Sequence, residues 1–224
     1  MSQSPNLENE DKLKLQGYEF IAGIDEVGRG ALAGPVVAGA VILPRGYPPW
    51  FKSVRDSKEL SPRQRECLFH LIDQEAIAVG VGIVSHQMID TVNILKSTKL
   101  AMMQAIEKLS KQPQFLLIDG LTLPQCPIPQ KGVIKGDKSC LSIACASIIA
   151  KVTRDHIMKE LDKVYPGYDL ARHKGYATGE HIFHLKQLGP SPIHRLSFAP
   201  VRNVIAVSQS SEQSEEAAKQ SQIK

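Results

Sequence analysis

Acidic residues follow short apolar segments at three places along the chain. Asp25 ends EFIAGID and Glu26 follows it, Asp119 ends FLLID, and Asp137 comes shortly after GVIK. A carboxylate at the end of an apolar strand is costly unless it is solvated, paired or bound to a metal. Oxygen ligands suit Mg²⁺ or Mn²⁺ better than Zn²⁺, and two such ions would permit in-line displacement at a phosphodiester. Each acid alone could instead cap a turn or pair with a nearby Lys or Arg.

Two glycines flank an arginine just after the first acidic pair, in Gly28-Arg29-Gly30. Glycine permits positive φ and lets a ligand approach the backbone closely, so exposed amides there can hold phosphate or sugar oxygens. A dinucleotide-binding loop is disfavoured. The spacing is GxGxxxG, and the strand-like segment PVVAGAVIL follows where that fingerprint needs a helix.

Other reactive side chains give weaker signals. No evident His base accompanies Ser57, Ser142 or Ser147, so a serine hydrolase lacks support. His181 and His184 have a spacing that could ligate a metal on a helix, but no clear third ligand accompanies them, and we expect surface or packing roles. The four cysteines form no CxxC pair, which favours reduced thiols in a cytosolic protein.

The apolar patterns predict the strands and helices that must position these residues. Strands are expected over residues 19–25, 35–43, 77–85, 115–119 and 132–135. Helices are expected over 62–75, 94–111, 139–165 and 179–188, the first of them capped by Ser61 with Pro62 in its first turn. Leading strands followed by alternating helices and strands predict an α/β domain with a mixed sheet.

Composition limits the class of protein. The 224 residues suit one domain, and 42% apolar with 22% charged residues excludes wholesale disorder. The net charge of +4 permits a polyanionic partner without requiring one, although residues 131–174 carry nine Lys or Arg against five Asp or Glu. Residues 1–17 form a polar segment without a secretory signal, and residues 203–224 are expected to be a disordered tail. The apolar stretches are too short to span a bilayer, so we expect a cytoplasmic protein.

The motifs together resemble those of bacterial ribonuclease HII, a family of type 2 ribonucleases H. The resemblance runs through most of residues 18–202. It is carried in family order by GIDEVGRGALAGPVVAGAVIL (23–43), DSKEL (56–60), IDG (118–120), KGD (135–137), SIACASIIAKVTRD (142–155), HKGYAT (173–178) and SFAPVR (197–202). Cys145 stands where Ala is usual in the family, a change that is conservative in size.

The resemblance implies a ribonuclease H-like α/β fold: a mixed five-stranded sheet flanked by helices, with a helical C-terminal extension over about 161–202. It implies an endoribonuclease that hydrolyses the RNA strand of RNA/DNA hybrids. The enzyme would also nick 5′ of ribonucleotides embedded in duplex DNA, leaving a 3′-OH and a 5′-phosphate, and so serve ribonucleotide removal from DNA. Two divalent ions, Mn²⁺ or Mg²⁺, would be held by Asp25, Glu26, Asp119 and Asp137. The family is usually monomeric, and we expect a monomer.

The same resemblance implies how the substrate is read. Gly28, Arg29, Gly30 and Tyr176 would sense the 2′-OH, the group that distinguishes RNA from DNA locally. A Tyr hydroxyl can hydrogen-bond the 2′-OH while its ring stacks on the neighbouring sugar.

Cations are expected to bind the substrate phosphates. The candidates are Lys58 and Arg29, followed by His173, Lys174 and Arg202. Asp155, in the Arg-Asp pair of the long helix, is expected to have a structural role.

Two other functions fit these residues less well. A non-catalytic nucleic-acid binder would gain nothing from four carboxylates that repel phosphates, and a phosphatase acting on small phosphates would not need both the glycine-rich loop and Tyr176.

Overall fold

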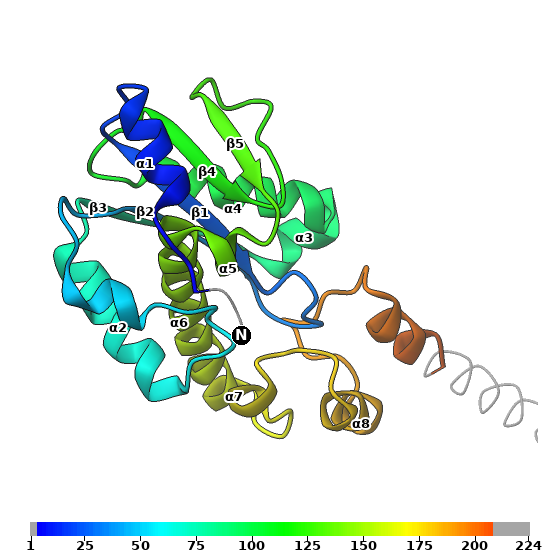
Figure 1. Ribbon diagram of the computed structural model, residues 1–224. Helices are drawn as coiled ribbons and strands as arrows, with labels where there is room; N and C mark the ends of the chain where they lie inside the picture. Colours follow the sequence, from blue (N-terminus) through cyan, green and yellow to red (C-terminus); the bar gives the residue numbers. More distant parts are fainter. Residues whose placement is uncertain (1–3, 208–224) are drawn as a thin grey trace, which may run out of the picture.

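A five-stranded mixed sheet forms the centre of the protein (Figure 1), whose computed structural model describes residues 4–207. The strands are β1 (Ile21–Val27), β2 (Val36–Ile42), β3 (Ala78–Val84), β4 (Phe115–Asp119) and β5 (Gln130–Val133). Their order is β3-β2-β1-β4-β5. The pairs β1–β2 and β2–β3 are antiparallel, whereas β1–β4 and β4–β5 are parallel. The predicted mixed sheet is therefore confirmed. The fifth strand lies two residues earlier than expected and the first strand two residues later, so that β1 includes both Asp25 and Glu26.

Helices surround this sheet and continue beyond it. They are α1 (Glu8–Leu15), α2 (Pro62–Glu75), α3 (His86–Val92), α4 (Ile94–Glu107), α5 (Gly136–Ser139), α6 (Leu141–Val164), α7 (Leu170–His173) and α8 (Gly179–Leu188), with a 3-10 helix at Pro49–Ser53. Residues 199–207 are also helical. The start of α2 is set as predicted, because Ser61 and Gln64 form a reciprocal capping box.

The long helix predicted over residues 139–165 corresponds to α6, which runs from Leu141 to Val164, and the short helix α5 precedes it. Cys140 separates them in an extended conformation, with φ −118° and ψ 123°. This break matters for the site, because it lets the short α5 carry Asp137 while α6 runs under the sheet.

The sheet is covered on both faces. Helix α4 packs with alternate apolar residues of β2, such as Ala38 and Ala40, whereas α6 packs against the opposite face. Glycines let α6 approach closely: a Cβ at Gly23 would lie 2.1 Å from the carbonyl carbon of Ser142, and one at Gly39 would lie 2.4 Å from the Ala146 oxygen. The small side chains of α6 thus bring its backbone against β1 and β2.

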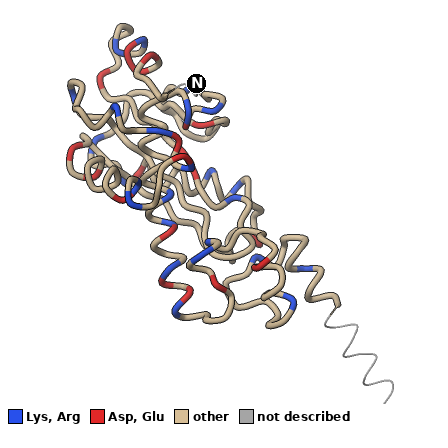
Figure 2. The backbone as a smooth tube through the Cα atoms, turned by 60° about the horizontal axis from the view of Figure 1, so that its bottom comes forward, with Lys and Arg blue, Asp and Glu red and all other residues tan. Residues whose placement is uncertain are grey.

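Helices α7, α8 and 199–207 lie beyond the sheet, where α6 ends (Figure 1). Figure 2 shows the same extension at one end of an elongated molecule, with Lys, Arg, Asp and Glu on both parts. The expected tail begins at residue 203, but residues 203–207 continue a helix, and residues 208–224 lie outside the described part. None of the helices within residues 4–207 has the length and apolar character needed to cross a membrane.

Helix α1 lies inside the segment that composition describes only as polar. Its Glu10 is buried, and one of its carboxylate oxygens accepts hydrogen bonds from the Ser142 N–H (2.8 Å) and the Cys140 thiol (3.2 Å). Since no side chain of α6 caps its own first turn, Glu10 supplies that partner from 132 residues away. The packed chain therefore includes α1.

Candidate active site

Three acidic residues meet at one edge of the sheet, where the parallel pairing of β1 with β4 ends. Ile24 of β1 pairs with Ile118 of β4, so the next residues, Asp25 and Asp119, lie side by side. Glu26 follows on β1. Asp137 comes from α5, just after β5, the strand that pairs with β4 on its other side. The structure thus brings all four predicted acids to the same edge.

Asp25 is the most deeply buried of the four, with 6% of its surface exposed. The Glu26 N–H donates to its Oδ1 at 2.8 Å, and Ser147 of α6 also hydrogen-bonds it. Burial raises the pKa of Asp25 well above its usual range, and the charges of Glu26 and Asp119 raise it further. Ser147 also contacts Ser57 at 3.0 Å, which links this carboxylate to the DSKEL segment.

Only one of the two carboxylate oxygens of Glu26 has a hydrogen-bond partner. Arg29 donates to its Oε1 at 3.0 Å, whereas its Oε2 is buried without a hydrogen-bond partner. Burial raises the pKa of Glu26 despite the opposing Arg29 charge, and Asp119 raises it further. An unpartnered buried carboxylate oxygen is costly, so this atom is available to a cation.

Asp119 and Asp137 complete the acidic edge. Asp119 Oδ1 accepts the Gly136 N–H at 2.6 Å; burial raises the pKa of Asp119 more than this bond lowers it, and Asp137 raises it further. Lys58 Nζ lies 3.6 Å from Asp137 Oδ2. Burial opposes the charged form of Lys58, but Asp56, Asp137 and Asp25 outweigh it and raise the pKa of Lys58, so the lysine stays protonated.

The donor set fits a hard divalent cation. It consists of carboxylates alone. Asp25, Glu26 and Asp119 have raised pKa values, and Glu26 also has an orphaned oxygen, so the nearby charges of Arg29 and Lys58 do not fully compensate the four acids. Among the residues that the structure describes, however, no three His, Cys, Asp or Glu side chains are arranged to hold a metal ion as they stand. The four carboxylates therefore share one edge without forming a closed set of ligands.

The glycine-rich loop and Tyr176 lie together beside this edge, as the sequence motifs predicted. Ala31 forms a β-bridge with Tyr176, and the Leu32 N–H donates to the Gly175 carbonyl at 2.7 Å. Gly28 has φ +91°, and a Cβ there would lie 2.2 Å from Nε of Arg154. This position therefore requires glycine both for its backbone conformation and for space.

Two buried arginines hold these segments, and sequence reasoning missed both. Arg154 of α6 donates to the carbonyls of Pro35 (2.9 Å), Ala33 (3.1 Å) and Lys174 (2.9 Å). Arg195 donates to Gly34 (3.0 Å) and Arg29 (3.0 Å). The available signal was an arginine at position 154 within the apolar, small-residue face of a helix.

His173 does not support the expected phosphate contact. It is 8% exposed, its Nε2 lies 2.6 Å from the Tyr168 carbonyl, and its Nδ1 accepts the Gly175 N–H at 3.1 Å. Since both ring nitrogens already serve the backbone, His173 shapes the turn that leads to Tyr176.

The other predicted phosphate contacts are Lys174 and Arg202. The Lys174 carbonyl accepts from Arg154, its ammonium donates to the Ala171 carbonyl, and Arg202 is exposed in the helix 199–207. Asp155 accepts from Lys151 at 2.8 Å on the same helix, which supports a structural role.

His181 and His184, the pair with metal-ligand spacing, diverge. His184 is exposed, whereas His181 is fully buried with its Nε2 3.0 Å from that of His194.

Comparison with known proteins shows similarity to ribonucleases HII. A family model described as Ribonuclease HII matches residues 22–201. A protein named Ribonuclease HII from Dehalococcoides mccartyi is 54% identical over 202 residues, covering 90% of this chain and 95% of the relative.

Solved structures share the fold. The ribonuclease H2 of Pyrococcus horikoshii OT3 superposes with a TM-score of 0.69 at 27% identity, covering 83% of this chain and 97% of that one. A Bst-RNase HIII determined in complex with Mn²⁺ has a TM-score of 0.61 at 18% identity, covering 84% and 70%. The expected fold, a mixed five-stranded sheet with helices as in ribonucleases H, is confirmed.

Proposed function

Because the chain belongs to the ribonuclease HII family, we propose that its endonuclease activity resides at the acidic edge formed by Asp25, Glu26, Asp119 and Asp137. The activity is hydrolysis of the RNA strand of RNA/DNA hybrids and nicking at ribonucleotides within duplex DNA. The observation that carries the assignment is the meeting of four carboxylates beside the Gly28 loop and Tyr176. The cut is made 5′ of the ribonucleotide and leaves a 3′-OH and a 5′-phosphate.

The four carboxylates would hold two divalent ions, Mn²⁺ or Mg²⁺. When bound at such a site, these ions activate a water and stabilise the leaving oxygen of a phosphodiester. The protein's own contribution is to keep buried carboxylates in place at one edge. Ser147 orients Asp25, and the Gly136 N–H orients Asp119.

Ribose recognition belongs to the loop and the tyrosine. The Tyr176 hydroxyl bonds the 2′-OH, and the backbone of Gly28, Arg29 and Gly30 lines the same ribose. Support comes from the Ala31–Tyr176 bridge and from Arg154, which contacts the loop and the tyrosine ring together. A site built to bond a hydroxyl rejects a nucleotide that lacks it, because its own polar groups are left unpaired.

Lys58 is a proposed phosphate contact beside the carboxylates. Its pKa is raised, so it stays charged beside Asp137 and can attract a backbone phosphate into an otherwise repulsive acidic edge.

The test is cleavage of a DNA duplex that contains one ribonucleotide, with and without Mg²⁺ or Mn²⁺. We expect one metal-dependent nick 5′ of the ribonucleotide and none in the all-DNA duplex. Well-folded protein that binds the duplex but never cuts it would favour a binding module. Cleavage of nucleotides but of no duplex would favour a small-phosphate hydrolase.

A further inference from the structure

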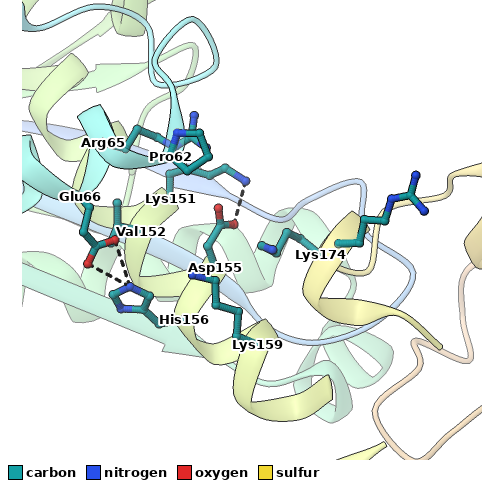
Figure 3. A pocket seen from close by; sticks show the side chains of 10 residues that line it. Pro62, Arg65, Glu66, Lys151, Val152, Asp155, His156, Lys159 and Lys174 are labelled. Atoms are coloured by element: carbon teal, nitrogen blue, oxygen red, sulfur yellow. Dashed lines mark hydrogen bonds and ion pairs between the residues drawn. The ribbon is translucent and has the colours of Figure 1, made fainter. Parts of the chain in front are cut away.

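A basic pocket lies outside the acidic edge, between α2, α6 and the segment after α7 (Figure 3). Its volume is about 270 Å³. Five of its lining residues are cationic: Arg65, Lys151, Lys159, Arg172 and Lys174. Only two are acidic, Glu66 and Asp155. Arg172 is paired with Glu180 and Asp169 outside the lining, so the positive excess comes from the other four cations. We refer to this hollow as the basic pocket.

The two acids of the pocket are already engaged. Glu66 Oε1 lies 3.1 Å from His156 Nε2, and Asp155 Oδ1 lies 2.8 Å from Lys151 Nζ; both contacts appear as dashed lines in Figure 3. Lys159, by contrast, is exposed, and its ammonium has no hydrogen bond or ion pair within the described range 4–207. A cation therefore remains at the rim without a counterion.

The cations also act on one another. Burial lowers the pKa of Lys174; Asp155 opposes this effect, but Lys151 and Lys159 lower the pKa further. Like charges that depress one another's protonation are stabilised by an incoming anion. The pocket therefore carries positive charge that a bound anion would neutralise.

Helix α6 connects the basic pocket with the proposed active site. Lys151 lies one helical turn after Ser147, the residue that hydrogen-bonds Asp25. On the other side, Arg154 donates to the Lys174 carbonyl and faces the Tyr176 ring. An elongated anion that occupies the site can therefore extend into the pocket.

We propose that the basic pocket binds the sugar–phosphate backbone of the duplex whose ribonucleotide occupies the acidic edge, several nucleotides away from the cut. Lys159 lies twelve positions after Ser147 on α6, which corresponds to a distance of about 18 Å along the helix axis at about 1.5 Å per residue. One strand carries a phosphate about every 3.4 Å along the helix axis, so the contact falls about five nucleotides from the cut. The occupant is a polyanion rather than a free phosphate because Lys151 and Lys159 follow α6 away from the carboxylates, two helical turns apart. This inference rests on the proposed function.

The experiment measures Kd by fluorescence anisotropy for a duplex with one ribonucleotide, with EDTA present so that no cleavage occurs. Lys159→Glu is compared with Lys96→Glu, an equal charge reversal at an exposed lysine of α4, on the opposite face of the sheet. We expect Lys159→Glu to raise Kd by about tenfold and to reduce the slope of log Kd against log salt by about one. Lys96→Glu should change Kd by less than about twofold, since such distant charges are screened.

Duplex length provides the second arm. The duplex is shortened to two base pairs on one side of the ribonucleotide and then, separately, on the other. Wild-type protein should lose affinity on one of these sides, and Lys159→Glu should be insensitive to that same truncation. Equal Kd values for Lys159→Glu and wild type, or equal sensitivity to truncation, would overturn the proposal. Protein that cuts no duplex under any metal would instead contradict the proposed function, while the Kd comparison still tests the pocket.

Discussion

The guanidinium carbon of Arg154 lies 5.4 Å from the centre of the Tyr176 ring. The same guanidinium donates to the carbonyls of Ala33, Pro35 and Lys174 and fills the space beside Gly28. One buried side chain therefore ties the glycine-rich loop to the tyrosine that is proposed to read the ribose.

Replacing this arginine should destabilise the protein. Arg154→Met keeps the length of the side chain but leaves three carbonyl acceptors without their donor, and each buried unsatisfied group costs about 1–3 kcal/mol. We expect a loss of about 3–5 kcal/mol in the free energy of unfolding, measured by urea denaturation. Arg63→Met, at an exposed position of α2, is the control and should be near neutral. An Arg154→Met protein with the same free energy of unfolding as wild type would contradict the role of Arg154 in holding the loop and Tyr176 together.

Tyr176→Phe should weaken ribose recognition while it keeps the ring that faces Arg154. Loss of one hydrogen bond to the 2′-OH should lower kcat/KM on a single-ribonucleotide duplex by about tenfold, or about 1.4 kcal/mol. The measurement is steady-state nicking, with Tyr47→Phe, an exposed tyrosine, as the matched control. Unchanged kcat/KM would remove Tyr176 from the recognition set.

Asp119→Asn should abolish most activity without unfolding the protein. Asn keeps an oxygen that can accept the Gly136 N–H but lacks the charge that a divalent cation needs. Loss of several kcal/mol of transition-state stabilisation lowers kcat by more than about 100-fold. Nicking is assayed in Mg²⁺ and in Mn²⁺, and duplex binding should persist. Asp73→Asn, at an exposed position, should behave as wild type; near wild-type kcat for Asp119→Asn would refute the ligand set.

Acid should weaken the fold through two buried histidines. His181 and His194 contact each other, and burial, as the main cause, lowers the pKa of each to about 4. Between about pH 6.5 and about pH 4 the unfolded chain binds protons that the folded chain excludes, so stability falls as pH decreases across this window. Each unit of depression corresponds to about 1.4 kcal/mol.

The carboxyls at the acidic edge act in the opposite direction. The raised pKa values of Asp25, Glu26 and Asp119 make folding more favourable as pH falls. The histidine contribution is therefore measured as the difference between wild type and His181→Gln in urea midpoints from pH 7.5 to pH 4.5. We expect that difference to shrink on acidification, whereas His70→Gln, at an exposed position, should track wild type. A constant difference would contradict the assignment.

Glu10→Ala should destabilise the start of α6. It removes the acceptor of the Ser142 N–H, a loss comparable to that of a helix cap, at about 1–2 kcal/mol. Glu10→Gln keeps an acceptor oxygen and should recover most of this loss. The measurement is the urea midpoint, and equal midpoints for Glu10→Ala and Glu10→Gln would contradict a capping role.

The sequence by itself determined which residues could do chemistry. Local patterns predicted strands that end at Asp25 and Asp119, because alternation and apolar runs report burial without knowledge of the fold. The end at Asp119 is confirmed, whereas β1 continues to Val27. The motif resemblance predicted that Tyr176 serves the same site as Gly28. Sequence-local signals also set the start of α2 at Ser61, since a cap depends only on residues a few positions apart.

The tertiary structure alone decided which side chains are buried and with which partners. The sequence predicts His173 as a phosphate contact and His181 in a surface or packing role, yet packing encloses both side chains and commits their nitrogens to the backbone and to His194. Glu10 reads as part of a polar segment, yet it caps a helix that begins 131 residues later. The physical reason is the same in each case. A hydrogen bond between distant residues is set by how helices pack on the sheet, and no local period along the chain encodes that geometry.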